Sequence, residues 1–313
     1  MANLNVVVIG SPGYARELGK KGTESDVTIY NMKKGEDTLT IMEPSRYPEK
    51  LAPLSYSVFF ADYAIRVVEK IDASFGESLL MLDAAGPESG AVILRNYITE
   101  DQIDRYIKET RIGNYEVLED DVIQLREKLW KLIPASTEEE TSYGTVIVDH
   151  YFKVKGIGTV ALGVLESGTI RKHDNLKAHP GEATAQIRSI QKHDTDFDTA
   201  TLHDRVGLAL KNIETEEMTK GVVLTNDPTI QTTTEIKGTI QLNKFWLNPI
   251  KEGMPVHIGH WMQFNAARIT TLENEIEATI TLDKPIAYRM GNIAAVTYLD
   301  GGNLRVMGTI KLN

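Results

Sequence analysis

Over residues 1–133, short apolar runs alternate with segments in which apolar residues recur every three to four positions. The short runs are typical of buried strands, and the periodic segments are typical of helices with one apolar face. We expect strands at Asn5–Ile9, Val27–Tyr30, Leu39–Met42, Tyr63–Val68, Gly90–Leu94 and Tyr115–Leu118. We expect helices at Leu51–Asp62, Phe75–Ala85, Glu100–Thr110 and Asp120–Ile133. This alternation predicts a mostly parallel sheet that is covered by helices on both faces.

The pattern changes at Pro134–Ser142, a polar and acidic stretch that we interpret as a linker. Beyond it, short alternating runs rich in β-branched residues and interrupted by glycines predict strands, and clear helical periodicity stops. Asn226-Asp227-Pro228 marks a second boundary. The sequence therefore predicts an α/β domain over residues 1–135 and two all-β barrels, over residues 136–227 and 228–313.

Composition narrows the class of protein. No apolar run approaches the ~20 residues of a membrane span, and the start of the chain has no basic leader before an apolar segment, so we expect no membrane and a cytoplasmic location. There is no cysteine, which excludes disulfides, a thiol nucleophile and thiolate metal ligands. The net charge of −10 argues only mildly against a nucleic-acid partner, because the potential at the contact surface decides binding.

The first predicted strand runs into Gly10–Leu18, where a phosphate-binding loop would lie if this domain bound a nucleotide. Such a loop reads G-x-x-x-x-G-K-[ST], because glycine N–H groups, a lysine and a hydroxyl hold the phosphates and Mg²⁺. That pattern cannot be placed here. Lys20, Lys21 and Gly22 are better interpreted as the end of a helix.

Several segments carry a family resemblance: LGKKGTESDVTIYN (18–31), VKGIGTVALGVLESGTI (154–170), IRSIQKHD (187–194) and HDRVGLALKNIETEEMTKGVVL (203–224). In order and spacing they resemble the first three domains of elongation factor Tu-type translation factors, and most of all the archaeal selenocysteine-specific factors of the SelB group. The resemblance implies a degenerate GTPase-like α/β domain followed by two β-barrels. It also implies tRNA as the ligand, with or without an aminoacyl group, and other translation components as further partners.

The family's nucleotide motifs can be located in this chain, and their residues differ. The D-x-P-G-H motif falls on Met42, Glu43, Pro44, Ser45 and Arg46. The Mg²⁺-orienting aspartate, the glycine and the histidine of that motif are therefore replaced. We interpret Glu43 and Arg46 as a surface pair rather than as a catalytic pair.

The guanine-reading N-K-x-D motif falls on Asn96, Tyr97, Ile98 and Thr99. Thr99 cannot supply the carboxylate that reads guanine, and Tyr97 cannot replace the lysine. Together with the missing glycine loop after Gly10, these changes predict that the chain neither binds nor hydrolyses GTP and needs no cofactor. An atypical GTP-binding elongation factor is the first alternative.

The resemblance also suggests tRNA-contacting residues. Phe152 falls near the family's pocket for the acceptor end, and Lys211 stands where an arginine approaches that end. Lys153 and Lys155 are two residues apart, which predicts one face of a strand. Arg268, Arg289 and Arg305 are the cations of the last barrel with enough reach to contact phosphates.

His257 and His260 are three apart on an extended run and should point to opposite faces, which disfavours a shared metal ion. We therefore expect no metal site. The hypothesis is a nucleotide-free, tRNA-binding relative of SelB and elongation factor Tu. The second alternative is a protein-interaction module of the translation apparatus that has lost RNA contact.

Overall fold

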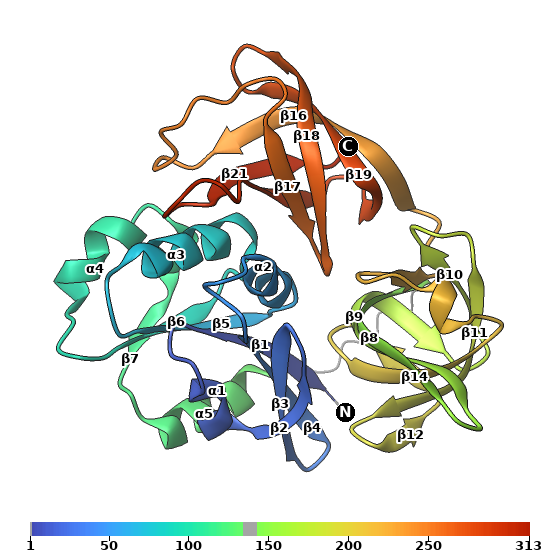
Figure 1. Cartoon of the computed structure of the whole chain (residues 1–313). Coiled ribbons are helices and arrows are strands. Elements are labelled where there is room, and N and C mark those ends of the chain that lie inside the picture. Colours follow the sequence, from blue (N-terminus) through green and yellow to red (C-terminus); the bar gives the residue numbers. More distant parts are fainter. Residues whose placement is uncertain (1, 134–142) are drawn as a thin grey trace.

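The computed structural model describes residues 2–133 and 143–313, so the predicted linker at Pro134–Ser142 lies outside the described residues. Three units are arranged around a common junction: an α/β domain, here the first domain, and two β-barrels, here the first and the last barrel (Figure 1). An α/β domain followed by two barrels confirms the predicted fold class.

The first domain is built on a seven-stranded sheet in the order β2-β3-β4-β1-β5-β6-β7. Strands β1, β4, β5, β6 and β7 run parallel, while β2 and β3 pair antiparallel at one edge. The strands are β1 (Asn3–Ile9), β2 (Lys20–Glu24), β3 (Val27–Lys34), β4 (Asp37–Pro44), β5 (Tyr63–Val68), β6 (Gly90–Leu94) and β7 (Glu116–Leu118). The central strands β1 and β5 are buried along their whole length, as their continuous apolar runs predicted.

Helices cover both faces of this sheet. Helices α2, α3 and α4 pack on one face and α1 and α5 on the other, in two separate apolar clusters. The helices are α1 (Tyr14–Leu18), α2 (Ala52–Phe59), α3 (Ala73–Ala85), α4 (Glu100–Ile107) and α5 (Val122–Leu132), with a 3-10 turn η1 (Arg111–Asn114). Thr99 begins α4 with a capping box that Gln102 completes, which accounts for the predicted start.

One local prediction was wrong. Lys20 and Lys21 do not end a helix, because α1 stops at Leu18 and the chain turns into the edge strand β2. Lys20 lies opposite Asn31 in an antiparallel ladder with β3. The β2 side chains are exposed or half-exposed, so no apolar alternation announced this strand.

The first barrel follows the path β10-β15-β8-β9-β14-β11-β12 and closes through pairing of β10 with β11. Its elements are β8 (Gly144–Val154), β9 (Gly158–Arg171), β10 (Asn175–His179), β11 (Thr184–Lys192), β12 (Thr195–Phe197), β13 (Thr199–Thr201), β14 (Arg205–Lys211), η2 (Thr215–Glu217) and β15 (Val223–Thr225). Strand β8 ends at Val154, so Lys155 lies in the following turn. The prediction that Lys153 and Lys155 share a strand face was therefore wrong.

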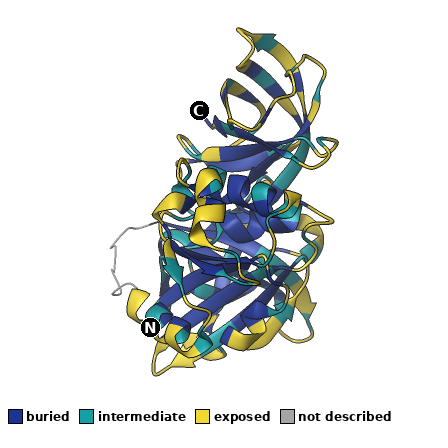
Figure 2. Ribbon diagram, turned by 90° about the vertical axis from the view of Figure 1, so that its left-hand side faces the viewer, coloured by how far each residue is buried: buried dark blue, intermediate teal, exposed yellow. Residues whose placement is uncertain are grey.

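The last barrel is closed, in the order β16-β19-β18-β17-β20-β21. Its strands are β16 (Ile230–Leu242), β17 (Pro255–His260), β18 (Gln263–Glu273), β19 (Glu277–Arg289), β20 (Ile293–Thr297) and β21 (Val306–Lys311). Figure 2 shows this barrel stacked on the helices of the first domain. On β17, His260 is buried while His257 is half-buried, in keeping with their placement on opposite faces.

Candidate functional site

The turn between β1 and α1 holds a carboxylate of the protein itself. Glu43, near the end of the adjacent strand β4, accepts hydrogen bonds from the backbone nitrogens of Gly13 (2.7 Å) and Ala15 (3.2 Å). These N–H groups have no partner within the first turn of a helix and attract an anion. The Glu43 carboxylate meets this need. Glu43 therefore caps α1, and the expected surface pair of Glu43 with Arg46 was wrong.

Arg66 of β5 fills the space beneath the same turn. Its side chain is buried, with the residue 3% exposed, and it donates to the carbonyl oxygens of Ile9 (3.2 Å) and Val67. Burial lowers the pKa of Arg66 to about 10. Gly10 has φ +104°, and a Cβ there would lie 1.6 Å from Arg66 Nη1, so only glycine fits. Ligands of parallel sheets bind outside the carboxyl ends of the strands, at the switch point that Arg66 occupies here.

A second arginine links the neighbouring loops at this edge of the sheet. Arg95, directly after β6, bonds Asp120 (Nε–Oδ2 2.7 Å) and Glu69 (Nη1–Oε1 3.1 Å). Its guanidinium carbon lies 4.9 Å from the ring centre of Tyr14, whose hydroxyl donates to Asp120 Oδ1 at 3.0 Å. The hydrogen bond that Arg95 donates to Asp120 raises the pKa of Arg95. Arg95 is thus paired with two carboxylates at this edge of the sheet.

The residues at the degenerate motif positions have local structural contacts. Met42 is buried in an apolar cluster shared by all three units, and Pro44 is buried at the end of β4. The Ser45 hydroxyl lies 2.5 Å from that of Thr28, while Arg46 is exposed.

The loop after β6 has an unusual backbone. Asn96 and Tyr97 are both left-handed, with φ of 55° and 62°, and the Tyr97 side chain is fully exposed. Asn96 Nδ2 donates to the backbone oxygen of Glu69 at 3.1 Å. Thr99 serves as the cap of α4. The side chains of Asn96 and Thr99 therefore stabilise the backbone of this loop through hydrogen bonds.

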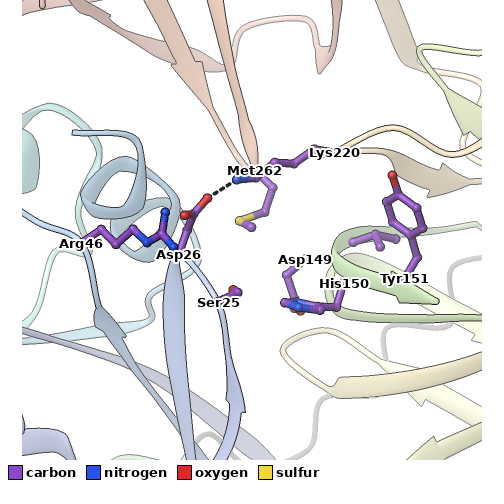
Figure 3. Close-up of a pocket in the computed structure, with 10 residues that line it drawn as sticks. Ser25, Asp26, Arg46, Asp149, His150, Tyr151, Lys220 and Met262 are labelled. Atoms are coloured by element: carbon purple, nitrogen blue, oxygen red, sulfur yellow. Dashed lines mark hydrogen bonds and ion pairs between the residues drawn. The ribbon is translucent and has the colours of Figure 1, made fainter. Parts of the chain in front are cut away.

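A hollow of about 410 Å³ lies where the three units meet (Figure 3). Lys220 of the first barrel forms an ion pair with Asp26 of the first domain across this hollow, and their hydrogen bond lowers the pKa of Asp26. Figure 3 shows Arg46 on the first-domain side and His150 and Tyr151 on the barrel side. The hollow is lined by Ser25, Asp26, Arg46, Val148, Asp149, His150, Tyr151, Lys220, Gly221 and Met262. Its cations could bind a phosphate or a carboxylate.

Asp149, at the wall of this hollow, is paired with Arg205 of β14 through two hydrogen bonds, one of them 3.0 Å long. Both side chains are about nine-tenths buried. Burial would raise the pKa of Asp149, but the charge of Arg205 and hydrogen bonds from His150 and Arg205 lower it overall. Asp149 and Arg205 thus form a buried ion pair between β8 and β14.

The outer face of the first barrel presents an apolar surface between strands β8, β9 and β14. Phe152 lies opposite Val160, and Val160 lies opposite Ala209, so their side chains share one face. Phe152 is 43% exposed, and Leu162 lies half-buried on the same face. Aromatic side chains on such faces are the groups on which unpaired bases stack.

Cations stand at the end of this apolar strip. Lys211 is on the same face as Ala209, two residues further along β14, and is exposed. Lys155 and Ile157 are exposed in the β8–β9 turn, and Arg188 donates to the backbone oxygen of Ile157 at 3.2 Å. Among the described residues, no ion pair holds Lys155, Lys211 or Arg188. We refer to Phe152, Lys155, Ile157, Arg188 and Lys211 as the basic rim surface.

The other predicted cations lie outside the basic rim surface. Lys153 pairs with Glu214 at 2.7 Å, and exposed Arg268 donates to the backbone oxygen of Gly253 at 2.5 Å. Arg289 binds Glu166 and Asp227 between the barrels. Arg305 binds Glu77 of the first domain. The structure therefore brings Phe152, Lys155 and Lys211 together and places Arg289 and Arg305 at seams between units.

From the sequence we did not identify the structural roles of Glu43, Arg66 and Arg95. We also did not identify Arg188 as part of the basic rim surface. A lone arginine inside the apolar run YAIRVV was a usable signal for Arg66, because a charge in a central strand must find partners. Within the described residues, no cluster of His, Asp or Glu could hold a metal ion. No helix in this part of the chain is long and apolar enough to cross a membrane.

Comparison with known proteins gives concordant results. The protein family described as elongation factor Tu domain 2 matches residues 158–225. An uncharacterized protein of Methanocaldococcus jannaschii is 38% identical over 314 residues, with 100% of both chains covered. The selenocysteine-specific elongation factor of the same organism is 24% identical over 267 residues, which are 78% of this chain and 56% of that protein.

Solved structures show the same fold. The structure of translation elongation factor SelB from Methanococcus maripaludis, in complex with the GTP analogue GppNHp, superimposes with a TM-score of 0.83 at 20% identity. The superposition covers 100% of this chain and 79% of that chain. At this identity the likeness concerns the fold alone.

Proposed function

This chain belongs to the elongation factor Tu/SelB-like family of translation factors, and from that premise we propose that it binds tRNA without binding or hydrolysing GTP. The observation that carries the proposal is the basic rim surface. There, an exposed aromatic ring and three cations free of ion pairs among the described residues border an apolar strip. Unpaired bases stack on such strips, and cations at the border hold the backbone phosphates.

Two internal groups support the nucleotide-free part of the proposal. The Glu43 carboxylate occupies the backbone N–H groups of Gly13 and Ala15, which a phosphate would otherwise use. Arg66 fills the switch point of the sheet below them. A bound triphosphate would have to displace the carboxylate and would find neither the glycine loop nor the lysine. Without hydrolysis to control release, RNA binding depends on contacts and salt alone, and we place the protein among cytoplasmic translation components.

A direct binding measurement tests the proposal. Radiolabelled tRNA is titrated with the wild-type protein and with the double variant Lys155→Ala/Lys211→Ala in a filter-binding assay. We expect the double variant to bind about tenfold more weakly, or ~1.4 kcal/mol. The matched control is Lys108→Ala/Lys131→Ala, which removes two exposed lysines from the first domain and should leave the affinity unchanged.

Two other results would count against the proposal. Wild-type protein that retains no tRNA at low salt, but recovers a translation protein in a pull-down, would favour the interaction-module alternative. Equal losses in both double variants would mean that any surface charge suffices and that the basic rim surface has no special part.

A further inference from the structure

The first domain and the last barrel share an interface that is packed like a protein core. Helices α2 and α3 contact β17, β20 and β21 directly. Ala295 and Val306 of the barrel are completely buried in the same apolar cluster as Phe75. At Gly259 the backbone comes so close that a Cβ would lie 2.6 Å from the Ser55 hydroxyl oxygen. Interfaces packed this closely resist relative movement.

A buried ion pair fixes the same interface. Glu77 on α3 is 3% exposed and accepts three hydrogen bonds from Arg305: from Nη2 (2.6 Å), Nε (2.8 Å) and the backbone nitrogen (3.1 Å). The Arg305 side chain also donates to the backbone oxygen of Pro48 at 2.8 Å. Together with the apolar contacts, this pair makes one rigid unit of the first domain and the last barrel.

The seam between the first domain and the first barrel has a different character. At one end, His203 Nδ1 lies 2.7 Å from Asp62 Oδ1, and both side chains are partly exposed. The His203 carbonyl accepts hydrogen bonds from the side chains of Asn3 (2.9 Å) and Asn5 (3.1 Å) on β1. At the other end is the half-exposed pair of Lys220 with Asp26, beside the 410 Å³ hollow.

Among the described residues, the apolar cluster that crosses this seam lies at the three-unit junction. There the first barrel contributes Ile147 and Val223 to a cluster with Val27, Ile29 and Met42 of the first domain. The hydrogen bonds to the His203 carbonyl come from the buried side chains of Asn3 and Asn5. The ion pairs of His203 with Asp62 and of Lys220 with Asp26 are partly exposed to water. Partly exposed ion pairs of this kind contribute little to stability.

The first barrel is anchored to the last barrel near the point where the chain passes between them. Arg289 donates to Glu166 (3.2 Å), Ser167 (2.7 Å) and Asp227 (3.1 Å). Gly221 approaches the last barrel closely, since a Cβ there would lie 2.5 Å from the Met262 carbonyl oxygen. These contacts form a pivot at one corner of the first barrel.

We propose that the first barrel, residues 144–225, swings as a body about this pivot against the rigid unit, and that the contact between His203 and Asp62 latches it closed. The motion would open the hollow between Asp26 and Tyr151. It is a property of the free protein and is measured without RNA, so it stands or falls separately from tRNA binding.

The latch responds to protons in a defined direction. The charged groups that act on the His203 ring are Asp62 and Asp204, and Asp204 is itself paired with Lys192 at 2.5 Å. Burial alone would lower the pKa of His203, but the hydrogen bond and charge of Asp62, with the charge of Asp204, raise it overall. The ion pair of protonated His203 with Asp62 is therefore fully formed below the ordinary histidine pKa of about 6.5. It weakens as the pH rises through the raised pKa of His203.

Because the chain has no cysteine, spin labels can be attached at introduced cysteines alone. Two label pairs at exposed positions suffice: Asp104→Cys with Lys172→Cys reports the first domain against the first barrel, and Asp104→Cys with Lys251→Cys reports it against the last barrel. Double electron–electron resonance gives the distance distribution of each pair. Asp62→Asn removes the latch charge, and Asp300→Asn is the matched surface control.

We expect Asp62→Asn to broaden and lengthen the distribution of the first pair while that of the second pair stays narrow. In the wild type the first pair should broaden between pH 5.5 and pH 8.5. His203→Asn, which tolerates the left-handed backbone at this position (φ 70°), should abolish that pH dependence. Identical distributions in wild type and Asp62→Asn at both pH values would overturn the proposal. Broadening of the second pair by as much as the first would overturn it as well.

Discussion

The carboxylate of Glu43 lies 2.7 Å from the backbone nitrogen of Gly13, at the start of the helix that follows the first strand of the sheet. An anion at such a position stabilises the helix through its free N–H groups and its dipole. Here the anion is part of the chain and comes from the adjacent strand β4. The first domain therefore supplies the anion that stabilises the start of α1.

Replacing Glu43 tests how much this contact contributes. Glu43→Ala removes both hydrogen bonds to the start of α1, and we expect the free energy of unfolding to fall by about 1–2 kcal/mol, as for the loss of a helix cap or of charged hydrogen bonds. Urea denaturation followed by circular dichroism measures the change. Glu119→Gln, at an exposed loop position, is the control and should change stability little. Equal stability of wild type and Glu43→Ala would show that the N–H groups find another partner without cost.

Nucleotide should leave the melting temperature unchanged. A ligand that binds only the folded state adds RT ln(1 + [L]/Kd), or ~2.7 kcal/mol at a hundredfold excess over Kd. With Arg66 at the switch point and Glu43 on the N–H groups, we expect no stabilisation by millimolar GTP or GDP with Mg²⁺. Differential scanning fluorimetry measures this directly. A rise of several degrees with either nucleotide would revive the atypical GTPase alternative.

The strand and helix pattern of the first domain could be read from the sequence because its central strands are continuous apolar runs. The strand at Tyr63–Val68 was predicted with the bounds that the structure shows. The edge strand β2 was missed because its side chains lie in solvent, and pairing of the backbone alone leaves no pattern in the sequence.

The candidate site was harder to predict because its contacts are between residues far apart in the chain. Lys211 and Phe152 were found through the family resemblance, and they share the outer face of the first barrel. The carboxylates that bind Arg289 and Arg305 belong to other units. The sequence therefore does not distinguish an arginine that contacts RNA from an arginine that forms an ion pair between units. Only the fold distinguishes them.

Arg305 should therefore behave as a stability determinant. Its partner Glu77 is buried, and removing one member of a buried ion pair leaves an unpaired charge, which costs about 3–5 kcal/mol. We expect Arg305→Ala to lower the midpoint of urea unfolding strongly, while the salt dependence of tRNA binding by the remaining folded protein stays unchanged. If Arg305→Ala kept full stability and instead weakened tRNA binding, Arg305 would be a phosphate contact.

Asp149 predicts a pH dependence of stability at acid pH. Its pKa is lowered in the folded protein, so its contribution is present above the ordinary aspartate pKa of about 3.9 and is lost as the pH falls through the lowered value. Near neutral pH we expect Asp149→Asn to reduce the free energy of unfolding by about 3 kcal/mol. The difference between wild type and variant should shrink below about pH 4. Urea titrations at several pH values test this, and a difference that does not depend on pH would mean that Asp149 acts through packing.

Binding of tRNA should be electrostatic and should depend on the basic rim surface. Each phosphate that a cation neutralises releases counterions, so for about four contacts the slope of log affinity against log salt should be roughly −3 to −4. Lys155, Arg188 and Lys211 are exposed and form no ion pair among the described residues, so each is available for such a contact.

Lys211→Ala and Arg188→Ala should each weaken binding and make the slope shallower by about one. Lys153→Ala should change it less, because Lys153 is already paired with Glu214. Filter binding between 50 and 300 mM salt measures these slopes. An affinity that ignores salt, or a slope that Lys211→Ala leaves intact, would place the RNA contact elsewhere on the protein.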